Sequence, residues 1–225
     1  SWPGLSLGVA AMLAFLARTP LKLVLVDGWR GRWLPRTTVA ARVAGVELVV
    51  LATLVVAAAL AADARFWWPL LVAAPLVAIE LWFDMRSRSR RLVPELAGTV
   101  GIGSVAAAIA LADGVETRPA LGLWIVVAAR AAAAIPYART QVFRTRGRPN
   151  HLWHSDLAQA IAALAVTVGW LVDAVPRAAA IAIAVVAVFN VAAVRAAPRP
   201  AKIIGFQQMF FGFAVVIVTA IAVLA

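Results

Sequence analysis

The stretch VAGVELVVLATLVVAAALAA, residues 43–62, decides the fold. Glu47 is its only charged residue, and a helix needs about 20 mostly apolar residues to cross the hydrocarbon core of a membrane. Similar apolar runs recur along the chain between short stretches that contain arginine or proline. They predict spans near residues 3–17, 41–61, 67–83, 93–112, 119–138, 157–173, 178–194 and 203–224. We therefore expect an all-α, polytopic transmembrane helix bundle of about eight helices, forming a single domain over residues 1–225.

The composition excludes most other classes of protein. Of the 225 residues, 64% are hydrophobic and 14% are charged, whereas a soluble domain is about 45–50% apolar and about 25% charged. One globular core cannot bury this excess, so a cytosolic enzyme is ruled out. The chain has no cysteine, which excludes disulfides, thiolate metal sites and a thiol nucleophile.

The first span leaves two alternatives open. About 13 residues separate Gly4 from Arg18, which is short for a membrane crossing. Either the first helix is short, or a further helix precedes Ser1 and the bundle has nine helices.

The positive charge of the chain predicts its orientation. The chain has 21 lysine and arginine residues and 10 acidic residues. In a membrane protein such an excess of positive charge indicates which loops face the cytoplasm, rather than nucleic-acid binding. If successive loops alternate sides, 17 of the basic residues fall in loops 18–42, 86–91, 139–148 and 195–202. The opposite loops hold Arg65, Arg118 and Arg177. Because basic loops stay in the cytoplasm, we expect these four loops on the cytoplasmic side of the membrane.

Two stretches carry further structural expectations. Loop 18–42 contains Trp29 and Trp33 among arginines and is expected to lie on the inner leaflet surface. Pro20 and Pro35 bracket this loop and argue against a continuous helix through it. In span 93–112, small residues such as Ala97 and Gly101 recur four apart, which favours close helix packing.

Ionisable residues within membrane spans are costly and usually face the bundle interior. Here they gather in the cytoplasmic half, and Tyr137 shares a helix face with Arg130, seven residues earlier. They predict a cytoplasm-facing polar cavity lined by Glu47, Glu80, Asp84, Glu95, Arg130, Tyr137 and Arg139. The alternative is an ion pair of Arg130 with Glu80 or Glu47 that only pins helices together.

The loop 86–91 concentrates positive charge. Arg86, Arg88, Arg90 and Arg91 stand in six residues, just before a span begins. Guanidinium groups bind phosphate in a bidentate manner, and a helix N-terminus adds a positive dipole end. The loop is either a specific site for a phosphate-bearing ligand or a topology anchor on anionic headgroups. Both interpretations predict membrane lipids, mainly anionic ones, as partners.

No cofactor or metal is expected. His151, His154 and Asp156 lie close together without a cysteine, a weak pattern for a metal site. Two histidines in one loop cannot serve as axial haem ligands within facing spans.

Several runs resemble the YwiC-like family of bacterial membrane proteins: residues 88–98 (RSRRLVPELAG), residues 200–212 (PAKIIGFQQMFFG), residues 18–22 (RTPLK), and Trp124 with Arg130 and 137–139. This family has no established activity that the resemblance could imply. In layout the chain also resembles UbiA-type prenyltransferases, nine-helix bundles that bind prenyl diphosphate through magnesium held by aspartate-rich motifs. The corresponding stretches here, residues 18–22 and 139–144, are basic, and guanidinium groups cannot replace carboxylate ligands of magnesium.

Together these features favour a non-enzymatic function. We expect an integral inner-membrane protein with an arginine-rich, cytoplasm-facing cavity that binds an anionic or isoprenoid lipid, or an accessory subunit of a membrane complex. One alternative is a UbiA-like transferase that acts on a phosphorylated lipid without the magnesium motifs. Another is a small-solute transporter, although no inverted repeat supports it.

Overall fold

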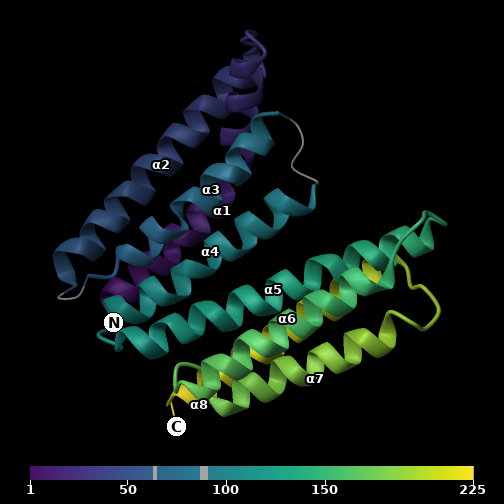
Figure 1. Cartoon of the computed structure of the whole chain (residues 1–225). Helices are drawn as coiled ribbons and strands as arrows, with labels where there is room; N and C mark the ends of the chain where they lie inside the picture. Colours follow the sequence, from purple (N-terminus) through teal and green to yellow (C-terminus); the bar gives the residue numbers. More distant parts are fainter. Residues whose placement is uncertain (63–64, 87–90, 225) are drawn as a thin grey trace. The chain divides into compact units, whose positions relative to one another are not determined.

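The computed structural model describes residues 1–62, 65–86 and 91–224, and within them every regular element is a helix (Figure 1). The helices are α1 (Trp2–Trp29), α2 (Pro35–Ala61), α3 (Trp68–Met85), α4 (Leu92–Ala112), α5 (Thr117–Thr145), α6 (Leu152–Leu171), α7 (Arg177–Ala193) and α8 (Ala201–Leu224). The prediction of an all-α fold with about eight helices is confirmed. Arg88 and Arg90 of the predicted phosphate loop lie outside the described residues.

Six of the described helices are long and apolar enough to cross a membrane: α1, α2, α3, α4, α5 and α8. The chain is therefore a multi-pass membrane protein. The eight predicted spans are supported for these six. The other two helices differ, because α7 is apolar but has only 17 residues, and α6 begins with the polar residues His154, Ser155 and Asp156.

The first helix is longer than predicted, and the expected loop 18–42 is wrong. α1 runs for 28 residues to Trp29 with Pro20 inside it, and only residues 30–34 connect it to α2. Pro20 removes one backbone hydrogen bond, yet Arg18 and Lys22 on either side of it both bond Asp84 of α3. These tertiary contacts stabilise the segment that the charges and the proline had suggested to be a loop.

The fifth helix also extends into a predicted loop. α5 continues through Arg139 and Arg144 to Thr145, so the expected loop 139–148 shrinks to residues 146–151. The side chains of Gln141 and Arg144 donate hydrogen bonds to the backbone oxygens of Ala193 and Val194 at the end of α7. These bonds satisfy carbonyls that a helix C-terminus leaves unpaired, and they hold the last turns of α5 in place.

The chain divides into two compact units, Ser1–Thr117 with α1 to α4 and Arg118–Ala225 with α5 to α8. That residues 1–225 form one domain remains a prediction. In the first unit α1 packs along α2, and α3 packs along α4 (Figure 1). A β-carbon added at Gly101 of α4 would lie 3.2 Å from Cγ2 of Val77 in α3, so the expected close packing of the small residues in this span is confirmed.

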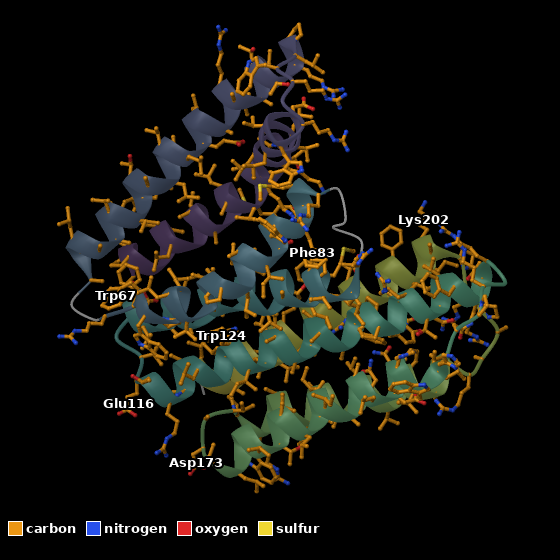
Figure 2. All side chains as sticks on the ribbon, turned by 45° about the horizontal axis from the view of Figure 1, so that its top comes forward. Trp67, Phe83, Glu116, Trp124, Asp173 and Lys202 are labelled. Carbon is orange, nitrogen blue, oxygen red and sulfur yellow. The ribbon has the colours of Figure 1, made fainter. Side chains whose placement is uncertain are left out.

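Both units place small residues inside and large apolar residues outside. The buried apolar set consists mainly of alanine, including Ala58 of α2 and Ala107 of α4. In the second unit, Val126, Ala133, Ala162, Val166, Ile183 and Val215 form the core among α5, α6, α7 and α8. Large side chains such as Leu60, Phe210 and Phe213 are exposed, and side chains cover the outer helix surfaces in Figure 2. This distribution is typical of helices that pack through small residues in a membrane.

Candidate functional site at the polar end of the first unit

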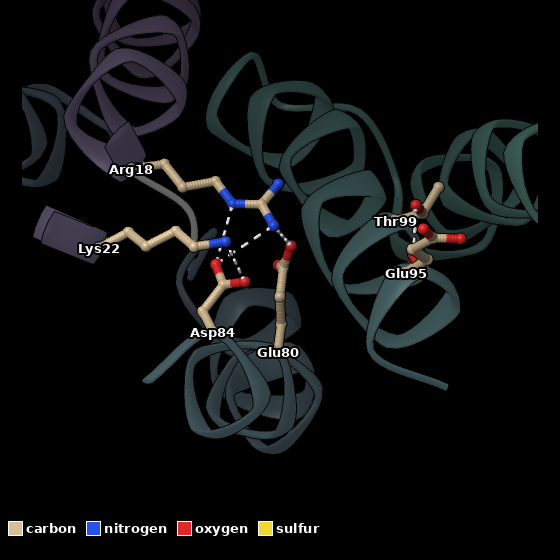
Figure 3. A network of polar contacts seen from close by, with 6 residues as sticks. All are labelled: Arg18, Lys22, Glu80, Asp84, Glu95 and Thr99. Carbon is tan, nitrogen blue, oxygen red and sulfur yellow. Dashed lines mark hydrogen bonds and ion pairs between the residues drawn. The ribbon is translucent and has the colours of Figure 1, made fainter. Parts of the chain in front are cut away.

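Four ionisable side chains meet between α1 and α3. Arg18 and Lys22 are four residues apart on α1, as Glu80 and Asp84 are on α3, and this spacing puts each pair on one helix face. Lys22 Nζ lies 3.1 Å from Asp84 Oδ1, and Arg18 Nη2 lies 3.3 Å from Asp84 Oδ2. Arg18 also forms an ion pair with Glu80 (Figure 3). The side chain of Asp84 is only 1% exposed, and the four-residue cluster joins α1 to α3 through these ion pairs.

A glycine on α4 makes room for this cluster. A β-carbon added at Gly98 would collide with the carboxylate of Glu80. Glu80 is therefore held between Arg18 of α1 and the bare backbone of α4. The sequence predicts Glu80 and Asp84 as site residues, whereas it places Arg18 and Lys22 in the basic loop 18–42 and in the RTPLK run. Their spacing of four, matched to that of Glu80 and Asp84, was the signal that could have identified them.

Glu95 lies in the first turn of α4. Figure 3 shows it beside Thr99 and apart from the four-residue cluster, and the Thr99 hydroxyl donates a hydrogen bond of 2.6 Å to the Glu95 backbone oxygen. A carboxylate in the first turn of a helix interacts favourably with the helix dipole. Glu47 lies on α2, where its Oε2 atom is buried without a hydrogen-bond partner among the described residues.

Two arginines, one in the turn between α1 and α2 and one at the start of α2, pair with a buried carboxylate of α1. Asp27 is buried and accepts a 2.6 Å hydrogen bond from the hydroxyl of Thr37. Arg32 Nε lies 3.4 Å from Asp27 Oδ1, and Arg36 Nε lies 3.6 Å from Asp27 Oδ2. Arginines that the sequence suggested for the membrane surface thus neutralise a buried carboxylate, which sequence reasoning had not singled out.

Arg86 stands at the C-cap of α3 beside two tryptophans. Its Cζ atom lies 4.2 Å from the ring centroid of Trp82 and 5.8 Å from that of Trp29, and the two rings pack edge to face with centroids 6.2 Å apart. Next to them is an open pocket of about 350 Å³, lined by Trp29, Arg30, Met85 and Arg86. Arg91 is exposed at the N-cap of α4.

The predicted site residues of the second unit lie on α5. Arg130 is 7% exposed, and its Nη2 atom donates to Gln208 of α8, 2.6 Å from the backbone oxygen and 3.0 Å from Oε1. Within its own unit each group has another partner, Gln208 for Arg130 and Arg18 for Glu80. An ion pair of Arg130 with Glu80 or Glu47 would join the two units and remains a prediction. Sequence reasoning missed Gln208 because glutamine carries no charge that would mark it in an apolar span.

Tyr137 and Arg139 are also on α5. Tyr137 is buried, and its hydroxyl oxygen accepts hydrogen bonds from Gln141 and from Gln207. The Cζ atom of Arg139 lies 5.7 Å from the ring centroid of Phe143. The predicted site residues therefore divide between the two units, and a single cavity lined by all of them remains a prediction.

Asp156 of α6 binds Arg195 through two hydrogen bonds of 3.0 and 2.8 Å, and these bonds raise the pKa of the Arg195 guanidinium. The ring of His154 stacks on that of Trp153, with centroids 4.0 Å apart. Among the residues that the structure describes, no group of three His, Cys, Asp or Glu side chains is arranged to hold a metal ion.

The fold and the site together define an α-helical multi-pass membrane protein with ion-paired polar clusters at one end of its first unit. Residues 1–110 match the family model of YwiC-like proteins, so the resemblance to this family is confirmed over these residues. The run at residues 200–212 lies beyond this match. None of the curated proteins and none of the solved structures compared with the chain matches it.

Proposed function

We propose that this membrane protein binds the phosphate-bearing headgroup of an anionic lipid at the pocket beside Arg86, on the cytoplasmic face of the inner membrane. The observation that supports it most is the placement of the Arg86 guanidinium over Trp82 and near Trp29, next to an open pocket of about 350 Å³. Pockets that hold small molecules span about 300–1,000 Å³, so its size fits a lipid headgroup.

The chemistry of Arg86 suits a phosphate. A guanidinium group that stacks on an indole is held in one orientation and keeps its N–H edge available for bidentate hydrogen bonds to phosphate oxygens. Arg86 makes no ion pair with any residue that the structure describes. Tryptophan side chains prefer the headgroup level of a membrane, and Met85 adds an apolar wall for the upper part of an acyl chain.

The nearby carboxylates are already neutralised. Asp84 and Glu80 are paired with Arg18 and Lys22, and Asp27 is paired with Arg32 and Arg36. These carboxylates therefore repel an incoming phosphate less than unpaired ones would. The ion pairs also fix the ends of α1 and α3, which carry Trp29 and Arg86.

Lipid retention by the purified protein tests this proposal. The protein would be extracted from membranes, exchanged into neutral detergent with equal amounts of phosphatidylglycerol and phosphatidylcholine, and examined by native mass spectrometry. We expect the unchanged protein to retain phosphatidylglycerol preferentially. Replacing Arg86 by Gln should reduce that retention about tenfold, since a hydrogen bond to a charged group is worth about 1.5–3 kcal/mol.

Arg65 supplies a matched control. It is exposed at the opposite end of the same unit, before α3 begins, so Arg65→Gln removes the same charge away from the pocket. Arg86→Lys keeps the charge but not the planar fork, and we expect it to retain an intermediate amount of phosphatidylglycerol. Equal retention by the Arg86→Gln and Arg65→Gln variants would show that the arginines act only as nonspecific surface charge.

A further inference from the structure

A closed belt of side-chain hydrogen bonds links the four helices of the second unit. Arg130 of α5 donates to Gln208 of α8, and Gln208 Nε2 donates to Asn190 Oδ1 of α7 at 3.0 Å. Asn190 Nδ2 donates to Gln159 Oε1 of α6 at 3.4 Å, and Gln159 Nε2 donates to the Ala133 oxygen of α5 at 2.9 Å. Arg130 is the only charged member of this amide belt, and it is buried.

The second unit has no carboxylate of its own to balance Arg130. Residues 118–225 contain two acidic residues, Asp156 and Asp173. Asp156 is bound by Arg195, and Asp173 is exposed in the turn between α6 and α7 (Figure 2). A buried charge is strongly unfavourable unless it is paired. An anion that pairs with the Arg130 guanidinium must therefore come from outside this unit.

Two buried polar atoms, one on α5 and one on α8, have no hydrogen-bond partner among the residues that the structure describes. Arg130 Nε, an N–H donor, makes no hydrogen bond, and neither does Gln207 Oε1, although the Gln207 amide nitrogen bonds Tyr137. Arg130 and Tyr137 are two turns apart on α5, and Gln207 adjoins Gln208 on α8. Buried donors and acceptors are nearly always satisfied by protein, water or a ligand. The Arg130 donor and the Gln207 acceptor therefore lack the hydrogen-bond partners that such buried atoms normally have.

The same region of α8 has room for a ligand. Gly205 precedes Gln208 by three residues and Gly212 follows it by four, so both lie on about the same face of α8 as Gln208. A β-carbon added at either glycine would meet no atom within 4 Å. The backbone of α8 is thus uncovered at Gly205 and at Gly212, on either side of Gln208.

From these observations we propose that Arg130 binds the single oxyanion of a long-chain amphiphile, whose apolar chain lies along Gly205 and Gly212. The oxyanion is a carboxylate or a phosphate, which accepts the hydrogen bond from Arg130 Nε and balances its charge. The amide belt holds the guanidinium in place and spreads its charge over neutral dipoles. This second site is separate from the pocket beside Arg86 and does not depend on the function proposed for that pocket.

Binding of three probes with the same chain length tests this proposal. Dodecanoate carries a carboxylate, dodecyl phosphate carries a phosphate, and dodecanol is neutral. Each would be added to the purified full-length protein in neutral detergent, and its retention and its effect on the melting temperature would be measured. We expect one or both anions to bind and to raise the melting temperature, and dodecanol to do neither. The anion that binds more tightly identifies the headgroup.

Two variants and one control localise the binding. Arg130→Gln removes the charge but keeps an amide that can join the belt, and Gly212→Leu fills the space beside the uncovered backbone while leaving Arg130 unchanged. Each should weaken anion binding about tenfold or more, as expected for loss of a charged hydrogen-bond partner or of its space. Arg146→Gln, at an exposed arginine just after α5, should bind like the unchanged protein.

Several outcomes would overturn the proposal. One is that neither anion binds the unchanged protein more tightly than dodecanol does, and another is that Gly212→Leu retains full binding. If Arg130→Gln fails to fold, Gly212→Leu alone decides the matter, because a β-carbon added at that position meets no atom within 4 Å. Loss of binding in the Arg86→Gln variant, with no change in the Arg130→Gln variant, would assign the anion to the pocket of Arg86 instead.

Discussion

Asp84 shows how a single buried carboxylate organises the first unit. It accepts hydrogen bonds from both Arg18 and Lys22, so its charge is satisfied although its side chain is almost fully buried. The two cations are more than a third exposed, and water screens part of their attraction. Asp84 is therefore the residue of the four-residue cluster whose loss should destabilise the contact between α1 and α3 most.

We predict that Asp84→Asn lowers the free energy of unfolding by about 1–3 kcal/mol, the usual effect of leaving buried hydrogen-bond partners unsatisfied. The amide keeps the shape of the carboxylate but has only one oxygen for two cationic donors. Thermal denaturation in detergent measures the change, with Glu116→Gln at an exposed position as the control. A second change, Lys22→Met, should recover part of the loss. No recovery would contradict the ion-pair account.

Gly98 offers a second test at the scale of one residue. Gly98→Ala forces a β-carbon against the carboxylate of Glu80, and overpacking of this kind costs about 1–3 kcal/mol. Gly45 in α2 is the matched control, since an added β-carbon there meets nothing within 4 Å. Gly45→Ala should raise stability by up to about 1 kcal/mol through helix propensity. An equal change of the melting temperature in both variants would show that the Glu80 carboxylate does not pack against Gly98.

The separate helices illustrate what the sequence could predict. Apolar runs predicted a helix at each of the eight places, and for six of them the length and hydropathy of the helix are those of a membrane span. Helix ends were less predictable. Arg18 and Lys22 looked like the start of a loop, since their acidic partners lie more than 60 residues away in the sequence. Only the tertiary contact with Asp84 makes these charges compatible with a continuous α1.

Cysteine scanning across residues 18–30 tests the continuity of α1. The chain has no cysteine, so a single introduced thiol can be labelled without background. If α1 continues to Trp29, labelling should vary along the segment with the helical period of about 3.6 residues. Asp27 and Ala17, which are buried, should mark protected positions. Uniform labelling from residue 18 onward would instead support the loop that the sequence suggested.

The candidate site was predictable only in part. Glu80, Asp84 and Arg130 stood out because charges are rare in membrane spans, and the structure gives each of them a definite set of contacts. The partners were not evident, because Gln208, Asn190 and Gln159 are neutral and far apart in the sequence. Arg86 is predicted as a site residue for its charge. Its position four residues after Trp82 places both on one face of α3, whereas no sequence spacing connects Arg86 to Trp29.

For the whole molecule, the distribution of basic residues predicts the topology. We expect residues 30–34 and 146–151 in the cytoplasm and Glu116 on the outside, because lysine and arginine concentrate in cytoplasmic loops. A cysteine at position 116 should react with a membrane-impermeant reagent in intact cells. A cysteine at position 146 should react only after permeabilisation. The reverse pattern would place the pocket of Arg86 on the outer face and contradict the predicted orientation.

The most direct test of the central proposal is a cryo-EM structure of the protein in nanodiscs that contain phosphatidylglycerol. We expect density for a headgroup in the pocket lined by Trp29, Met85 and Arg86, with a phosphate oxygen about 2.7–2.9 Å from the Arg86 guanidinium, the usual length of a charge-assisted hydrogen bond. The same density should be absent from the Arg86→Gln variant. A pocket that is empty of lipid in the unchanged protein, with ordered lipids elsewhere on its surface, would contradict the account.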